Sequence, residues 1–178
     1  TIEDIDLNFE DFRKKINSDL IGKVINLLSR SVSFIKNNDY KLATNLSDED
    51  HYQIFVSKTE NILKELHLRK YSSATKEIMR LADEANTFFN DNAPWKLDKD
   101  KDKKLIQEIS TQAINYYKII ITLLSPVLPN LFDESCKILN IQKLDIKNYQ
   151  DPTLDHEINK FSPLKSRIDE EVIKEFVN

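Results

Sequence analysis

The stretch FEDFRKKINSDLIGKVINLLSRSVSFI, residues 9–35, decides the fold class of this chain. Its apolar side chains recur every three or four positions, which is the spacing of one face of an α-helix. The residues in this pattern are Phe9, Phe12, Ile16, Leu20, Val24, Leu27, Leu28, Val32 and Ile35. The pattern predicts one long helix, with a bend near Asp19 and Gly22 because glycine inside a helix costs about 1 kcal/mol relative to alanine.

Two further helices follow with the same period. The first is predicted to begin at Ser47, which with Asp50 three residues later resembles a capping box. Its buried side carries Tyr52, Phe55, Ile62, Leu63 and Leu66. The next is predicted to be capped by Ser72 or Ser73 and to end near residues 92–94, since the residue before a proline is pushed out of helical geometry.

A charged and solvated run at residues 98–104 leads into a fourth helix, which ends at Ser125 before Pro126. A short fifth helix spans about 130–139. The sequence therefore predicts an all-α fold, a bundle of about five helices occupying residues 1–141.

Residues 142–178 show no sustained period up to Arg167 and contain Pro152 and Pro163. We expect them to form a C-terminal arm and not a core element. The arm is predicted to end in a short amphipathic helix whose apolar residues are Ile168, Val172, Ile173 and Phe176.

Glycine is almost missing from the chain. One glycine occurs in 178 residues, where average usage of roughly 7 per cent would give about twelve. Tight hairpins and phosphate-binding loops depend on glycine because it reaches positive φ without a steric cost. The scarcity favours helices and excludes a Gly-rich dinucleotide loop and a P-loop.

Charge and cysteine content limit the possible partners. The net charge of -4 argues against nonspecific coating of nucleic acid but leaves room for a local basic patch. The single cysteine, Cys136, lies in a helical pattern, where a core thiol is commoner than a reactive one. Neither a secretory signal nor an apolar run of membrane length is present, so we expect a cytoplasmic chain that contacts no membrane.

Catalytic and metal-binding patterns are missing. His51, His67 and His156 have no helical Glu-x-x-His partner, and Asp48 with His51 makes one ligand pair where a di-metal site needs several. No serine lies in a nucleophile elbow. We predict no catalytic residue, no metal and no cofactor in this chain.

Asn26 and Arg30 are four residues apart in the first helix, so their side chains lie on one face, one turn apart. An amide beside a planar guanidinium suits the hydrogen-bonding edge of a nucleobase and its phosphate. From spacing alone, the commoner reading is an exposed polar face with Arg30 in a surface ion pair.

Trp95 is the only tryptophan and follows Pro94, where a helix has ended. A lone tryptophan in a helical protein is usually a core anchor. The lysine-rich stretch behind it favours instead a stacking platform for an unpaired base. Its lysines are Lys96, Lys99, Lys101, Lys103 and Lys104.

Several blocks of the sequence resemble the anticodon-binding domain of methionyl-tRNA synthetases, in the family's order and with family-like spacing. They are DIDLN at 4–8, DLIGKVINLLSR at 19–30, IMRLADEAN at 78–86, APW at 93–95, LLSPVLP at 123–129 and SPLKSRID at 162–169. The last block is similar to the family's closing segment, which folds back toward the catalytic half.

The resemblance implies roles for individual residues. Trp95, in the block that also holds Pro94, would stack on the first anticodon base, a cytosine, while Asn26 and Arg30 bind that base's edge and the neighbouring backbone. Lysines near these positions are candidate contacts to the RNA backbone, namely Lys23, Lys96 and Lys99. Some family members carry a further asparagine where this chain has Gly22, so a third polar contact is not expected here.

The resemblance also implies a fragment. The family's His-Ile-Gly-His-type and Lys-Met-Ser-Lys-Ser-type signatures and its zinc-bearing insertion are not in this sequence. The intact protein would be a methionine-tRNA ligase that uses ATP, with zinc as a further candidate, in a catalytic half absent from this chain. The partner of this chain would be methionine tRNA, and not DNA.

Alternative functions stay open at the level of sequence. One is the anticodon domain of a related class I synthetase, such as those for leucine, valine, isoleucine or cysteine. Another is a helical scaffold that binds a protein through an apolar groove. A free-standing helical enzyme is poorly supported by the residues. Surface character discriminates between a tRNA-binding domain and a protein scaffold. A tRNA binder needs a basic patch around Trp95 and Arg30, whereas a scaffold needs a contiguous apolar patch.

Overall fold

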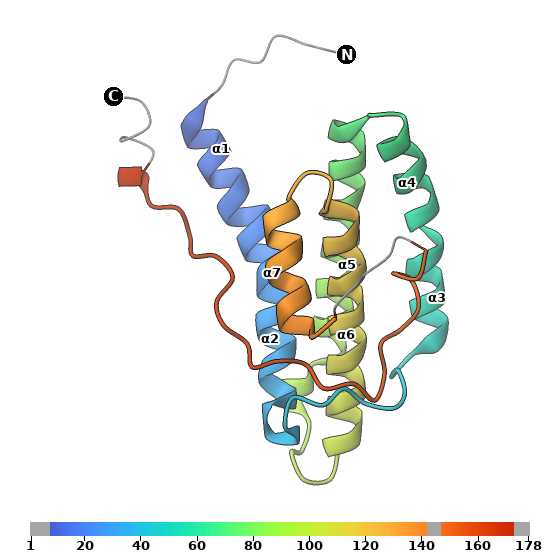
Figure 1. Cartoon of the computed structure of the whole chain (residues 1–178). Helices are drawn as coiled ribbons and strands as arrows, with labels where there is room; N and C mark the ends of the chain where they lie inside the picture. Colours follow the sequence, from blue (N-terminus) through green and yellow to red (C-terminus); the bar gives the residue numbers. More distant parts are fainter. Residues whose placement is uncertain (1–7, 142–146, 173–178) are drawn as a thin grey trace.

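Helices make up most of the computed structural model, which describes residues 8–141 and 147–172 (Figure 1). The central one is α6 (Lys103–Leu124), which packs against α2 (Asn26–Ile35), α5 (Tyr71–Asn92) and α7 (Pro129–Leu139). Most of its side chains from Ile106 to Leu124 are buried. No β-strand forms within the described ranges, where one isolated antiparallel bridge joins Lys41 to Glu157. The predicted all-α fold is confirmed.

The first predicted helix is continuous but not uniform. It consists of α1 (Phe9–Lys15), a π-helical segment η1 (Ile16–Ile25) and α2, and a 3₁₀ turn η2 (Lys36–Asn38) follows. The predicted irregularity near Asp19 and Gly22 takes the form of this π-helix. A Cβ atom at Gly22 would lie only 3.1 Å from the carbonyl oxygen of Asn17. A side chain here would crowd that carbonyl, so glycine fits this position. Figure 1 shows α1 leaning away from the other helices.

The second predicted helix is divided at Lys58 into α3 (Glu49–Ser57) and α4 (Thr59–His67). The predicted cap at Ser47 is wrong: Asp48 is the N-cap, and its Oδ1 accepts a hydrogen bond from the His51 N–H at 2.9 Å. The Ser47 hydroxyl instead donates to Gln112 of α6 at 3.0 Å. The Gln112 side chain thus binds this serine in place of the α3 backbone. The local sequence could not indicate this contact with another helix.

The start of α5 also differs from the prediction. The helix begins at Tyr71 after Lys70, whose side chain makes no cap hydrogen bond. Ser72 and Ser73 therefore lie inside the first turn, and the Ser73 hydroxyl donates to Glu65 at 2.9 Å. The reason is the tight turn after α4. In this turn the Lys70 N–H donates a hydrogen bond to the Glu65 carbonyl, and α5 begins at the next residue.

The C-terminal segment crosses the bundle as an extended chain (Figure 1). The expectation that it adds nothing to the core is wrong, because Tyr149, Ile158 and Leu164 are buried in the same hydrophobic core as the helices. In an extended segment, each apolar residue is buried only where the bundle offers a depression, so no period marks it in the sequence. Residues 170–172 are helical, and Val172 is exposed. The predicted apolar residues Ile173 and Phe176 lie outside the described residues.

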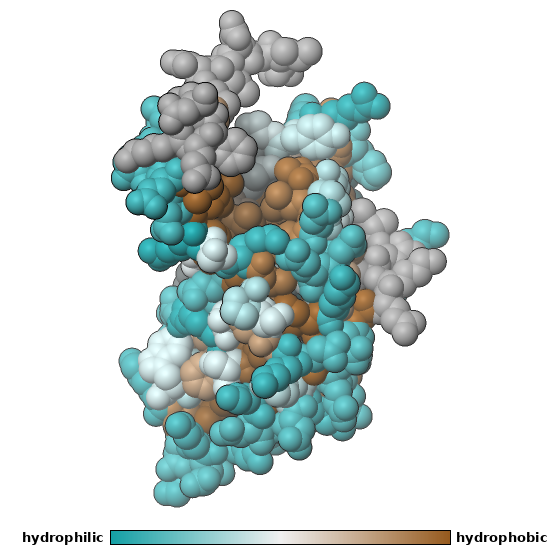
Figure 2. Space-filling view, turned by 60° about the vertical axis from the view of Figure 1, so that its left-hand side comes forward, coloured by the Kyte–Doolittle hydropathy of each residue, from teal (hydrophilic) through white to brown (hydrophobic). Residues whose placement is uncertain are grey.

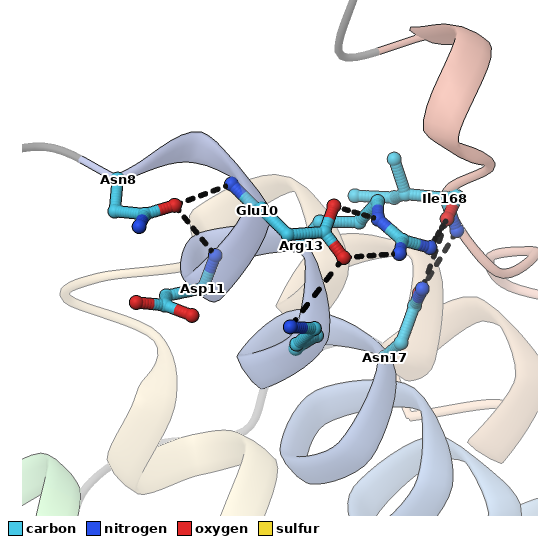
Figure 3. A network of polar contacts seen from close by, with 7 residues as sticks. Asn8, Glu10, Asp11, Arg13, Asn17 and Ile168 are labelled. Carbon is cyan, nitrogen blue, oxygen red and sulfur yellow. Dashed lines mark hydrogen bonds and ion pairs between the residues drawn. The ribbon is translucent and has the colours of Figure 1, made fainter.

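The end of the arm is fixed to the first helix (Figure 3). The Asn17 amide and the Ile168 backbone exchange two hydrogen bonds, of 2.9 and 2.8 Å. Arg13 donates to the same carbonyl while also pairing with Glu10 at 2.6 Å. Asn8 caps α1 by accepting from the N–H groups of Glu10 and Asp11. Of the block at 4–8, Asn8 alone is among the described residues.

An apolar groove stays open between η1, the start of α7 and this part of the arm. Its volume is about 350 Å³. Its apolar lining includes Ile16, Leu20, Ile21, Val127, Leu131 and Ile168. Figure 2, which brings this side of the molecule forward, shows hydrophobic residues gathered there between hydrophilic ones. None of the described helices is long and apolar enough to cross a membrane.

The middle of the arm is held by two buried polar residues of α6. The Asn115 amide exchanges two hydrogen bonds with the Thr153 backbone, of 3.0 and 2.7 Å. The Lys118 ammonium donates to the Asp151 carbonyl and, at 3.0 Å, to the Thr153 hydroxyl. Lys118 is only 3% exposed, and burial lowers its pKa to about 8.

This lysine predicts a pH dependence of stability. Between pH 8 and the ordinary lysine pKa of about 10.4, the unfolded chain binds a proton at Lys118 that the folded chain has lost. The free energy of unfolding should therefore rise with pH in this window. We expect the parent chain to gain about 2 kcal/mol from pH 8 to pH 10 relative to Lys118→Met. Urea denaturation of both proteins at pH 8 and pH 10 measures this difference in the free energy of unfolding. Parallel curves for the two proteins would contradict the prediction.

Candidate nucleic-acid interface

Trp95 is held at the surface by the way α5 ends. Ala93 adopts a left-handed conformation (φ 41°, ψ 58°), and its N–H donates to the Phe89 carbonyl at 3.2 Å. Pro94 is buried at the first position of a short 3₁₀ turn, η3 (Pro94–Lys96). The predicted helix end is confirmed. The turn presents the indole of Trp95 to solvent with 46% of the residue exposed.

Arg30 packs against this indole from α2. Its guanidinium carbon lies 5.2 Å from the ring centroid of Trp95 and 5.2 Å from that of Phe89. The ring centroids of Phe89 and Trp95 are 6.0 Å apart. One guanidinium nitrogen donates to Asn90 Oδ1 at 2.9 Å. The side chain is thus oriented before any ligand binds, and its other N–H groups have no partner among the residues described.

Asn26 lies one turn before Arg30 and is exposed. Its side-chain amide makes no hydrogen bond within the described parts of the chain, so a ligand can use both its donor and its acceptor. One turn further back, Gly22 offers no side chain. The tertiary structure places Arg30 and Trp95 in direct contact, and Asn26 lies one turn from Arg30 on the same face of α2.

The predicted backbone-binding lysines differ in their surroundings. Lys23 is ion-paired with Asp83 at 2.9 Å and with Asp19 at 3.4 Å. The hydrogen bond with Asp83 is the main cause of its raised pKa. Lys96 and Lys99 are exposed and form no ion pair with a described residue. They are the better placed to meet a phosphate, and the contact itself stays a prediction.

The loop behind Trp95 carries mixed charge. Five lysines alternate with four aspartates over residues 91–104, which leaves a net charge of +1. The Asp98 carboxylate is engaged within the loop, because it accepts hydrogen bonds from the N–H groups of Lys101 and Asp100 at 3.0 Å. These bonds lower its pKa and order the loop. The positive charge at the surface is therefore local and modest.

Two residues that hold the Arg30 guanidinium were not identified as site residues from the sequence. Phe89 lies on the buried side of α5, and nothing in the sequence around Asn90 marks it as a site residue. They lie about 60 residues from Arg30 in sequence, and only their contacts with the guanidinium show their part in holding it.

Residues with catalytic side chains are used structurally. His51 Nδ1 lies 2.6 Å from the Tyr116 hydroxyl, and His156 Nε2 lies 2.9 Å from the Leu139 carbonyl oxygen. Cys136 is half-buried, and burial raises the pKa of its thiol, which favours the unreactive protonated form. Across residues 8–141 and 147–172, no three His, Cys, Asp or Glu side chains gather in a group that could hold a metal ion.

Comparison with solved structures finds the same fold in a larger protein. The apo methionyl-tRNA synthetase of Mycobacterium tuberculosis matches with a TM-score of 0.78 and 18% sequence identity, over 92% of this chain and 35% of that chain. The same synthetase in complex with methionyl-adenylate matches with a TM-score of 0.72 and 17% identity, over 89% of this chain and 33% of that one. This chain thus spans about a third of the length of these proteins. No profile of a known protein family matches the sequence. At these identities the likeness shows the fold: this chain has the helical fold of one part of methionyl-tRNA synthetase.

Proposed function

We propose that this chain is the anticodon-binding part of a methionine-tRNA ligase and that it binds the anticodon loop of methionine tRNA through Trp95, Arg30 and Asn26. The sequence resemblance and the fold shared with methionyl-tRNA synthetase support the proposal from two sides. In the intact protein, the ATP-dependent attachment of methionine would be carried out by residues that this chain does not contain. The proposal implies action in the cytoplasm on tRNA.

The contact between Trp95 and Arg30 carries the proposal. A half-exposed indole with a guanidinium against it gives a flat aromatic surface beside a fixed positive charge. An unstacked base gains about 1–3 kcal/mol by stacking on such a ring. Arg30 then lies close enough to donate to the base edge or to the adjoining phosphate, which are the two acceptors a planar guanidinium binds best.

Asn26 adds base selectivity to this surface. An amide both donates and accepts, so it can pair with a base edge that presents an acceptor beside a donor, as cytosine does. A uracil in the same place presents a donor where the cytosine has an acceptor. The free Asn26 amide and the oriented Arg30 together support recognition of a cytosine.

Binding to tRNA is the direct test. The chain should bind methionine tRNA more tightly than a methionine tRNA whose first anticodon base is changed from cytosine to uracil, by about 1–3 kcal/mol. Filter binding at one fixed salt concentration measures both affinities. Equal and weak binding of the two RNAs would contradict the proposal.

A second candidate function is a docking site for another protein. The apolar groove between η1, α7 and the arm supports it, because grooves of this kind bind apolar side chains and not RNA. The binding experiment separates the two functions, since a protein scaffold would show no preference among anticodons.

A further inference from the structure

A groove of about 390 Å³ lies between α7 and the arm. Its lining includes Ser162 and Pro163 of the arm and Lys137 of α7. The arm is an extended chain here (Figure 1), and the backbone of residues 160–167 makes no hydrogen bond with any described residue. Side chains hold this stretch, among them the buried Leu164. The stretch can therefore leave the bundle locally without breaking a backbone hydrogen bond.

Ser162 has the surroundings that the substrate of a protein kinase needs. It is exposed, and its hydroxyl makes no hydrogen bond within the described part of the chain. Pro163 follows it directly, and Lys165 lies three positions after it. Protein kinases bind their substrate as an extended segment, and the proline-directed class selects Ser-Pro with a basic residue at the third position. Proline suits that class because it has no N–H that would stay unpaired in the kinase cleft.

The chain contains one other Ser-Pro pair, which lacks these features. Ser125 ends α6 in a helical conformation (φ -55°, ψ -34°), and its N–H donates to the Thr122 carbonyl at 3.2 Å. The third position after it is Leu128, an apolar residue. The Ser-Pro pair of the arm is thus extended and followed by a basic residue, whereas the pair at the end of α6 is folded.

The groove beside Ser162 carries positive charge that no carboxylate balances. Glu134, the acidic residue of its lining, pairs with Lys165 at 2.9 Å. Lys137 and Lys160 also line the groove, are exposed and have no ion-pair partner among the described residues. Their two positive charges match the charge of a phosphoserine at pH 7, which is about −1.5 to −2. A phosphate on Ser162 would meet donors of charge-assisted hydrogen bonds that are already in place.

We propose that Ser162 is phosphorylated by a proline-directed protein kinase and that Lys137 and Lys160 bind the phosphate in this groove. In the transfer, the Ser162 Oγ forms a bond to the γ-phosphorus of ATP while the bond from that phosphorus to the bridging oxygen breaks. ADP leaves with that oxygen, and the hydroxyl proton passes to the kinase. The bound phosphate ties the arm to α7, because Lys137 belongs to that helix. This modification does not require that the chain bind RNA.

Incubation of the chain with a cyclin-dependent protein kinase and ATP tests the modification. Mass spectrometry should find a single added phosphate, located at Ser162, and none on the Ser162→Ala variant. Ser125 is the control within the same molecule and should stay unmodified, because its segment is helical. An unmodified Ser162, or equally fast phosphorylation of Ser125, would overturn the proposal.

Hydrogen exchange measured by NMR tests the groove. The Asn159 N–H donates to the Ile138 carbonyl at 2.8 Å, so its exchange reports how often the arm leaves α7 at this point. Phosphorylation should slow this exchange about tenfold, the effect of one hydrogen bond to a charged group. Lys137→Ala should remove most of the slowing. Lys76→Ala is the matched control and should keep it, because Lys76 is an exposed lysine of α5 that does not line the groove.

Two results would show that the groove does not bind the phosphate. One is equal exchange at Asn159 in the phosphorylated and unmodified chains. The other is slowing that survives in the double variant Lys137→Ala, Lys160→Ala. Circular dichroism melts confirm that each variant is folded.

Discussion

Replacing Trp95 with alanine is expected to weaken binding of methionine tRNA by about 1–3 kcal/mol, the usual contribution of a base stacked on an aromatic ring. The structure adds a second reason for a large effect. The indole packs against the guanidinium of Arg30 at 5.2 Å, so its removal also frees that side chain from one of the two rings that orient it. Filter binding of the parent chain and the variant to the same tRNA measures the loss.

The effect on folding should be smaller. Trp95 is 46% exposed, and we expect its removal to lower the free energy of unfolding by roughly 1 kcal/mol. Trp95→Phe is the matched control, because it keeps an aromatic face and should retain most of the RNA affinity. If the alanine variant loses its fold while its folded fraction binds RNA as before, Trp95 is a core residue and not a stacking platform.

Arg30→Ala and Asn26→Ala are expected to reduce discrimination between cytosine and uracil at the first anticodon position, each by about 1–3 kcal/mol. Arg30 is already oriented by Asn90, Phe89 and Trp95, so little of its binding energy is lost in ordering the side chain. Asn26 has no competing partner among the described residues. The measurement is a double-mutant cycle between each protein variant and the cytosine-to-uracil change in the RNA.

A control arginine separates base recognition from charge. Arg80 lies on α5, ten residues before Asn90 and therefore about 15 Å away along the helix. Arg80→Ala removes the same charge and should weaken both RNAs slightly and equally. Coupling energies near zero for Asn26 and Arg30, with equal losses for both RNAs, would show that these residues hold only the RNA backbone.

Helix positions were largely predictable because they follow from local patterns. The period of apolar residues at 9–35 was enough to predict a continuous first helix, and Pro94 was enough to predict the end of α5. Helix starts were less predictable. Ser47 and Ser73 are typical capping residues, yet each donates to a side chain of another helix or turn, namely Gln112 and Glu65.

The candidate site was predictable only in part. Asn26, Arg30 and Trp95 could be selected from their residue types, local spacing and resemblance, and the structure places Arg30 on Trp95. The pairing of Lys23 with Asp83, 60 residues away, could not be read from the sequence. The same holds for a cavity beside Pro94, whose lining residues come from two distant segments.

The sequence by itself determined that this protein is helical, where most of its helices run, and that Trp95 follows a helix end. These properties depend on the apolar period, the scarcity of glycine and the geometry of proline, which act between residues close in the chain. Only the tertiary structure decided that Arg30 packs on Trp95 and Phe89, that Lys118 is buried against the arm, and that three apolar residues of the arm join the core. Such contacts join residues far apart in sequence, and their energies depend on distance and burial, which no local pattern records.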